Sequence, residues 1–137
     1  MSDTDGSLRF YRDLLGLRVV GDGENYGPEQ EHLNNVFGAR LHITTLHAAA
    51  GPGVEFLEYL APRDGRPAPT DIKANDLFHW QTVLTAHDAE PSFAAVTQAG
   101  GLFVSPGVVA LKDRALGFLR GALLRDPDGH GVELVEK

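Results

Sequence analysis

An internal repeat constrains the fold of this chain more than any other feature of its sequence. The segment Gly53–Tyr59 matches Gly131–Lys137 at four identical positions, 78 residues further along the chain. The helix-like segment Ser7–Gly16 corresponds in the same way to Ser92–Gly101, 85 residues further along. Because a repeated pattern indicates a repeated structural unit, we expect two related modules, and 137 residues leave room for both.

The second half of the chain shows the order of elements within a module. β-Forming residues predict a strand over Phe78–Thr85, and the segment Ala89–Ala99 is expected to be a helix with Pro91 in its first turn. Three further strands are predicted, at Phe103–Val109, Leu116–Arg125 and Val132–Glu136. The predicted module is therefore strand, helix, strand, strand, strand.

The first half repeats this order without the opening strand. Its predicted elements are a helix over Asp3–Leu17, strands at Leu17–Val20, Ala39–Leu46 and Val54–Leu60, and a long loop over Gly21–Gly38. A helical turn at Glu29–Val36 is an alternative for part of that loop. We therefore predict an α+β fold of two βαβββ modules in which the first strand of the first module is missing. Residues 1–61 form the first module, the Pro- and Gly-rich residues 62–75 a linker, and residues 76–137 the second module.

The last predicted hairpin contains a carboxylate in an unusual place. Asp126–Gly129 (Asp-Pro-Asp-Gly) is typical of a tight turn, because proline presets φ and glycine accepts a positive φ. Strand residues alternate between faces, so Val132 and Leu134 on the core side place Glu133 on the opposite face. A charge in mid-strand requires a partner or a metal if it is buried. Two other glutamates, Glu58 and Glu136, are expected to be exposed on the outer face.

The composition excludes several classes of protein. The formal charge of −7, without a cluster of Lys and Arg, argues against non-specific nucleic-acid binding. Without cysteine the chain has no thiolate ligand, disulfide or cysteine nucleophile. No apolar run approaches the ~18 residues that span a bilayer, and the acidic start is unlike a signal peptide. We expect a soluble cytoplasmic protein.

Two segments resemble the vicinal oxygen chelate superfamily, which includes glyoxalase I, bleomycin-resistance proteins and extradiol dioxygenases. Ser7–Leu17 looks like the first helix of that superfamily, and Asp126–Gly129 followed by Val132-Glu133-Leu134 looks like its closing hairpin. The resemblance implies two βαβββ modules whose sheets form an open, cup-shaped mixed sheet. In metal-dependent members the cup holds a divalent ion, and its ligands come from the first and last strands of each module.

The resemblance also implies a set of site residues. Glu55 and Glu133 occupy equivalent last-strand positions, and the first-strand ligand of the second module is His79 or Gln81. The first-strand ligand of the first module has no counterpart, so the set is incomplete unless His79 and Gln81 both contribute. Imidazole, amide and carboxylate ligands suit Zn, Fe, Mn, Ni or Co. Glu133 is also the expected catalytic residue.

Two classes of function follow from this resemblance. One is a metal-dependent lyase, isomerase or dioxygenase that acts on a small oxygenated metabolite. The other is a non-catalytic small-molecule (antibiotic-type) binding protein of the bleomycin-resistance kind. In either case, a missing first strand would leave a sheet edge open to pairing, so we expect a homodimer.

Overall fold

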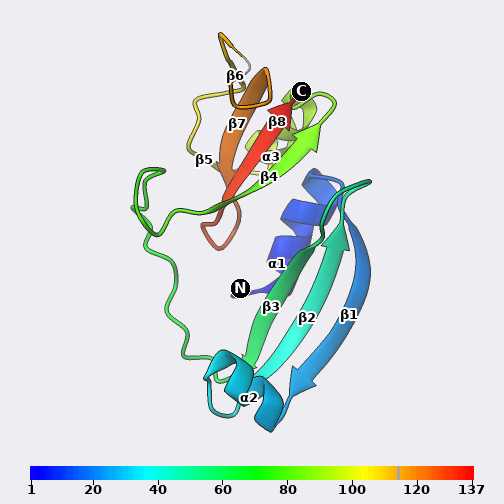
Figure 1. Cartoon of the computed structure of the whole chain (residues 1–137), viewed down its shortest axis with the longest axis vertical. Coiled ribbons are helices and arrows are strands. Elements are labelled where there is room, and N and C mark those ends of the chain that lie inside the picture. The colour runs from blue at the N-terminus through cyan, green and yellow to red at the C-terminus, as the bar shows by residue number, and fades with distance from the viewer. Residues whose placement is uncertain (114) are drawn as a thin grey trace. The chain divides into compact units, whose positions relative to one another are not determined.

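The structure of the chain is a computed structural model that describes residues 1–113 and 115–137. The chain divides into two compact units, Met1–Pro67 and Ala68–Lys137, and each is described by itself. Each unit combines helix with one β-sheet, as Figure 1 shows. The predicted α+β class is therefore confirmed.

The first unit contains a three-stranded antiparallel sheet in the order β1-β2-β3. The strands are β1 (Arg18–Tyr26), β2 (Arg40–His47) and β3 (Val54–Ala61). The helices are α1 (Thr4–Leu8), its π-helical continuation η1 (Arg9–Leu14), and α2 (Pro28–Asn34). The first part of the predicted loop over Gly21–Gly38 was wrong, because β1 continues through a bulge between Val19 and Gly21. The helical turn expected at Glu29–Val36 corresponds to α2.

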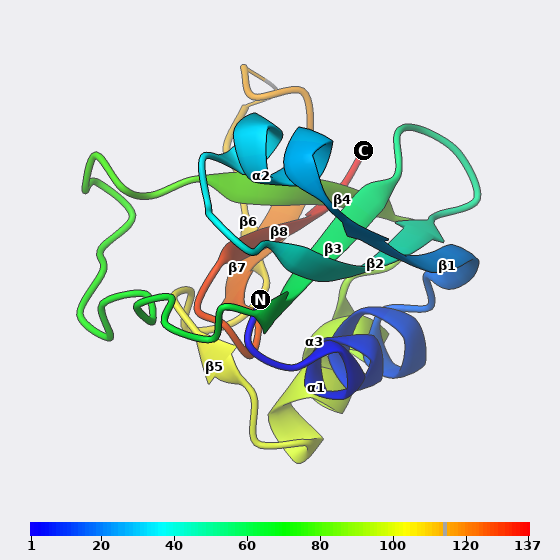
Figure 2. The same cartoon turned by 90° about the horizontal axis from the view of Figure 1, so that it is seen from below.

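The core of the first unit lies between its first helix and one face of its sheet (Figure 2). The ring of Tyr11 on η1 packs 5.1 Å from that of Phe56 on β3, centroid to centroid. Leu46 of β2 is fully buried on the same side of the sheet. Gly16, with a φ of 77°, ends the helix as the sequence predicted.

The second unit has the complete βαβββ order, with its third element split into two short strands. The elements are β4 (Gln81–Ala86), α3 (Glu90–Gln98), β5 (Leu102–Phe103), β6 (Val109–Ala110), β7 (Arg120–Arg125) and β8 (Gly131–Glu136). The sheet order is β4-β8-β7-β5, and β6 also pairs with β7. β4 runs parallel to β8, and the other pairs are antiparallel. Val96, Leu124 and Val132 are fully buried in its core.

The sheet of the first unit has no counterpart of β4 among the described residues. β8 is paired along both edges, by β4 and β7, whereas its repeat equivalent β3 is an edge strand of its sheet. On the open edge of β3, the carbonyl oxygen of Leu57 accepts a hydrogen bond of 2.8 Å from the amino group of Met1. The prediction of a first module without its first strand agrees with this arrangement.

Candidate functional site

Glu133 lies on the face of β8 that is turned away from the core. Its neighbours Val132 and Leu134 are 0% and 3% exposed, which places them on the core side as predicted. Glu133 itself is half-buried and pairs with Val83 of β4 on one side and Leu123 of β7 on the other. Glu133 thus lies on a strand that is paired along both of its edges.

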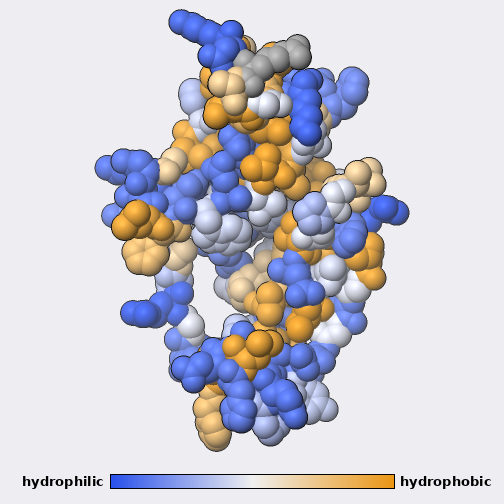
Figure 3. Space-filling view, viewed as in Figure 1, coloured by the Kyte–Doolittle hydropathy of each residue, from blue (hydrophilic) through white to orange (hydrophobic). Residues whose placement is uncertain are grey.

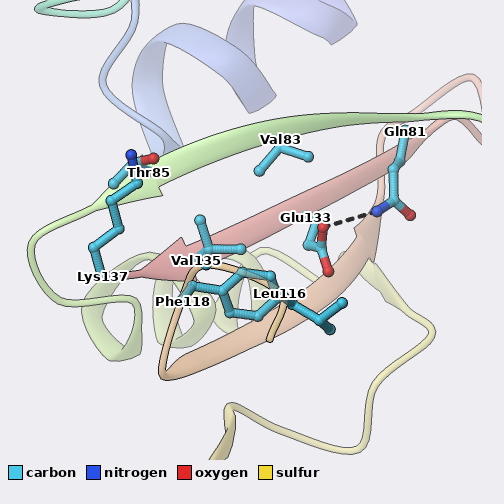
Figure 4. Close-up of a pocket in the computed structure, with 9 residues that line it drawn as sticks. Gln81, Val83, Thr85, Leu116, Phe118, Glu133, Val135 and Lys137 are labelled. Atoms are coloured by element: carbon cyan, nitrogen blue, oxygen red, sulfur yellow. Dashed lines mark hydrogen bonds between the residues drawn. The ribbon is translucent and has the colours of Figure 1, made fainter. Parts of the chain in front are cut away.

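A chain of hydrogen bonds connects Glu133 to three other polar side chains. The Gln81 amide nitrogen donates to Glu133 Oε2 at 2.8 Å (Figure 4), and His79 Nε2 lies 2.9 Å from Gln81 Oε1. The other ring nitrogen of His79, Nδ1, lies 3.5 Å from Nη1 of Arg125. The structure therefore brings three of the four predicted site residues, His79, Gln81 and Glu133, into one network.

Arg125 is a member of this network that the sequence analysis missed. Its guanidinium donates to the carbonyl oxygens of Gly129 at 3.0 Å and Ile72 at 2.9 Å. It thereby ties the end of β7 to the hairpin turn and to the segment that precedes β4. Ile72 is 53 residues away in sequence, so no local pattern could have indicated the contact.

Gly131 allows β8 to approach the beginning of β4 at this point. A Cβ atom on Gly131 would lie 2.9 Å from the carbonyl oxygen of Trp80 and 3.0 Å from both Gln81 Cβ and His79 Cε1. Backbone atoms cannot give way cheaply at such distances. The absence of a side chain at residue 131 is therefore what lets Gln81 reach Glu133.

A pocket of about 440 Å³ lies over this face of the second unit (Figure 4). Its floor comes from alternate residues of the two parallel strands, and its wall comes from the loop before β7. The lining residues are Gln81, Val83, Thr85, Leu116, Gly117, Phe118, Glu133, Val135 and Lys137. Apolar side chains also reach the surface over β7 and β8 in the space-filling view (Figure 3). Small-molecule sites combine apolar surface with precisely placed polar groups, and this pocket offers both kinds of side chain.

The wall of the pocket differs from the sequence prediction. Leu116–Phe118 was expected to belong to a strand, but β7 begins only at Arg120. The backbone N–H of Leu119 donates to the carbonyl oxygen of Glu136 at 2.8 Å, which holds the loop against β8. A Cβ atom at residue 121 would lie 3.1 Å from Phe118 Cε2, so Gly121 leaves room for this aromatic ring.

Glu55, the fourth predicted site residue, belongs to the first unit. It is exposed on β3 opposite Thr45, whose hydroxyl donates to Glu55 Oε1 at 3.2 Å. It lies on the opposite face of β3 from the buried Phe56, as Glu133 does relative to Val132 and Leu134 on β8. Its role as a metal ligand stays a prediction.

The expectation that Glu58 and Glu136 are exposed was wrong. Their side chains are each only 14% exposed. Glu58 Oε2 accepts the backbone N–H of Thr4 at 3.1 Å, and Glu136 Oε1 accepts that of Ala89 at 2.8 Å. The two repeats thus use equivalent glutamates to satisfy a free N–H group at the start of their helices.

The hairpin turn next to Arg125 is held by a second polar cluster. The buried Asp126 accepts the backbone N–H groups of Asp128 and His130 at 2.9 and 2.8 Å, and its Oδ2 lies 3.1 Å from His130 Nδ1. This hydrogen bond raises the pKa of His130 above its ordinary value, against the opposing effect of burial. The His130 ring also packs 4.9 Å from that of Trp80.

The donors fit a divalent ion only in part. The residues that the structure describes contain no group of three or more His, Asp and Glu side chains able to hold a metal ion. In the second unit, Gln81 and Glu133 are the pair that could share one, with His79 behind them. The Gln81 amide, however, turns its N–H group rather than its oxygen toward Glu133.

Solved structures with the same fold include several glyoxalase-type proteins. A glyoxalase family protein from Bacillus cereus has a TM-score of 0.79 at 20% identity, over 99% of this chain and 87% of that one. The trypanothione-dependent glyoxalase I of Leishmania major has a TM-score of 0.61 at 17% identity, over 99% and 80%. TioX from Micromonospora sp. has a TM-score of 0.59 at 20% identity, over 99% and 91%.

Comparison of the sequence with curated proteins and with family profiles gave different results. None of the curated proteins matches the sequence of the chain. Within the described residues, no helix is both long enough and apolar enough to cross a membrane. The profile of the Glyoxalase/Bleomycin resistance protein/Dioxygenase superfamily matches residues 1–134, nearly the whole chain. The chain therefore belongs to the Glyoxalase/Bleomycin resistance protein/Dioxygenase superfamily.

Proposed function

We propose that the second unit binds a small oxygenated organic molecule and that Glu133 is the residue that holds it. The observation that carries the proposal is the position of the Glu133 carboxylate in a pocket that Gln81, Thr85 and Lys137 line together with apolar side chains. Its Oε2 is engaged by Gln81, whereas its Oε1 accepts no hydrogen bond from the described part of the chain. A ligand hydroxyl could donate to this oxygen.

The apolar lining supports a ligand with a compact hydrophobic body. Val83 is 53% exposed and Leu116 is 69% exposed, although both side chains are apolar and line the pocket. Covering such surface stabilises a complex by ~25 cal/mol per Å². A hydroxylated aromatic or branched molecule would cover these side chains while its hydroxyl groups meet Glu133. This is the binding-protein function, of the antibiotic-type bleomycin-resistance kind.

Metal-dependent catalysis is the second candidate, and the repeat supports it. Glu55 and Glu133 occupy equivalent positions on β3 and β8, so each repeat presents a carboxylate at the same point of its last strand. With His79 and Gln81 they would supply ligands for Zn, Fe, Mn, Ni or Co. Such an ion would act as a Lewis acid that polarises a substrate carbonyl, and Glu133 is the proposed catalytic residue.

We also propose that the protein is cytoplasmic and forms a homodimer. The open edge of β3 supports the dimer, because an unpaired edge strand favours pairing with another chain. Light scattering at micromolar concentration should give twice the mass of one chain. A monomer mass across that range would contradict the dimer.

Catechol is a suitable probe for the binding proposal, because its two adjacent hydroxyl groups can donate to one carboxylate. We expect catechol to shift the backbone NMR signals of Val83, Phe118 and Glu133, which surround the pocket. Its dimethyl ether, which has the same ring but no hydroxyl donor, should cause much smaller shifts. Equal shifts with the two compounds, or shifts confined to other residues, would contradict the proposal.

Metal analysis tests the catalytic candidate separately. Protein supplemented with Zn²⁺, Fe²⁺, Mn²⁺, Ni²⁺ or Co²⁺ and then desalted should retain close to one ion per chain if that candidate is right. Glu133→Gln should lower this content. Retention of only trace metal under all five conditions would contradict the catalytic candidate.

A further inference from the structure

The hydrogen bonds around Gln81 determine which atom of its amide faces Glu133. The amide nitrogen faces Glu133 and the amide oxygen faces His79 Nε2. An amide oxygen only accepts hydrogen bonds and an amide nitrogen only donates them. His79 must therefore donate from Nε2, which means that a neutral His79 carries its proton on that nitrogen.

Arg125 favours the same tautomer of His79 from the other side of the ring. A guanidinium group has donors only, and Nη1 of Arg125 lies 3.5 Å from His79 Nδ1. Nδ1 must then present its lone pair. Because Arg125 is also anchored to the carbonyl oxygens of Gly129 and Ile72, the guanidinium cannot leave without losing two further hydrogen bonds.

A divalent ion shared by Gln81 and Glu133 would require the opposite arrangement. Metals bind an amide through its oxygen, so the Gln81 amide would have to turn and direct its oxygen toward Glu133. Its N–H group would then face His79 Nε2, which would have to become an acceptor. The proton of His79 would move to Nδ1 and meet the Arg125 donor.

We propose that Arg125 and His79 are positioning residues that hold the Gln81 amide with its nitrogen toward Glu133. This orientation favours an organic ligand at the Glu133 carboxylate and opposes a cation bridging Gln81 and Glu133. The inference rests on the proposed function for the role of Glu133. In this arrangement His79 contacts Gln81 and orients it, and His79 is not itself a direct ligand.

The tautomer of His79 can be observed directly. Long-range ¹H–¹⁵N spectra distinguish the two neutral forms of histidine, and at pH 8 an ordinary histidine is neutral. The variant His79→Asn identifies the His79 signals by their loss. We expect the proton on Nε2 in the unaltered chain. A proton on Nδ1 would overturn the proposal.

Zinc titration tests the consequence. Arg125→Met should bind Zn²⁺ at least about tenfold more tightly than the unaltered chain. Without the charged donor at Nδ1, His79 can carry its proton there and allow the Gln81 amide to turn its oxygen toward Glu133. In a Gln81→Glu background, where either carboxylate oxygen can face the metal, Arg125→Met should add no further gain. Equal Zn²⁺ affinity of Arg125→Met and the unaltered chain would overturn the proposal.

A second variant covers the case in which Arg125→Met disturbs the fold. His79→Leu leaves the contacts of Arg125 with Ile72 and Gly129 in place, yet it frees the Gln81 amide, so it should give the same gain in Zn²⁺ affinity. No gain in folded His79→Leu would overturn the proposal. If Glu133→Gln bound catechol as well as the unaltered chain does, the proposed function would be contradicted. The proposal about the His79 tautomer would not be affected by that result.

Discussion

Glu136 Oε1 accepts the backbone N–H of Ala89 at 2.8 Å across 47 residues of sequence. Three residues earlier on β8, Glu133 lies on the other face of the strand and lines the pocket. The first unit has the same pair on β3, where Glu58 accepts the N–H of Thr4 and Glu55 is exposed. In each repeat, one glutamate holds the helix start while the other lies on the opposite face of the strand.

Removal of the helix-anchoring glutamates should lower stability. Glu136→Ala and Glu58→Ala should each reduce the free energy of unfolding by about 1–2 kcal/mol, the usual effect of losing a helix cap. Glu55→Ala is the matched control, because its side chain is exposed, and it should change stability by less than about 0.5 kcal/mol. Urea unfolding measures all three, and equal losses in the three variants would contradict the assignment.

The roles of these glutamates show where sequence reasoning succeeds and where it fails. Strand alternation placed Glu133 opposite Val132 and Leu134 correctly, because that pattern is local. The same alternation places Glu136 on the face of Val132 and Leu134, so the expectation that Glu136 is exposed did not follow from the pattern. Its partner, the N–H group of Ala89, lies 47 residues away in sequence. The helix start therefore reaches Glu136 through tertiary structure that no local pattern encodes.

In the candidate site, too, local features could be predicted from the sequence and long-range contacts could not. The turn at Asp126–Gly129 was predictable from its residues, and Gly129 has the positive φ of 89° that the prediction requires. Arg125 was not predictable, since its partners His79 and Ile72 meet it only in the folded unit. The bulge that lets β1 run through Gly21 also depends on pairing with β2, which an apparently polar, glycine-rich segment does not indicate.

Close packing at Gly131 makes this residue sensitive to a single methyl group. Gly131→Ala would bring a Cβ atom to 2.9 Å from the Trp80 carbonyl oxygen, so β4 and β8 must separate locally. We expect a loss of about 1–3 kcal/mol in stability and weaker catechol binding. Gly23→Ala is the control, because its Cβ atom would meet nothing within 4 Å. Thermal unfolding that is unchanged in both variants would refute this view of Gly131.

His130 should make the hairpin sensitive to pH. Its hydrogen bond with Asp126 raises the pKa of His130 above the ordinary value of 6.5. Since the folded-state pKa is the higher one, the stabilising contribution is complete below the unfolded pKa and is lost as pH rises through the folded pKa. The contribution of His130 to the stability of the hairpin should therefore be larger at pH 6 than at pH 8.

Trp80, the only tryptophan of the chain, reports this titration because its ring packs against His130. We expect its fluorescence to change with a midpoint above 6.5, and the variant His130→Gln to lose that transition. A midpoint at or below 6.5, or a transition that persists in His130→Gln, would contradict the raised pKa.

Calorimetric titration of catechol into Glu133→Gln and Glu136→Gln tests the central claim most directly. Glu133→Gln should weaken binding by about 10- to 100-fold, because it replaces a hydrogen bond to a charged acceptor with one to a neutral amide. Glu136→Gln, which keeps an accepting oxygen for Ala89 and lies on the other face, should bind catechol as the unaltered chain does. Equal affinities in the two variants would contradict Glu133 as the ligand-holding residue of the pocket.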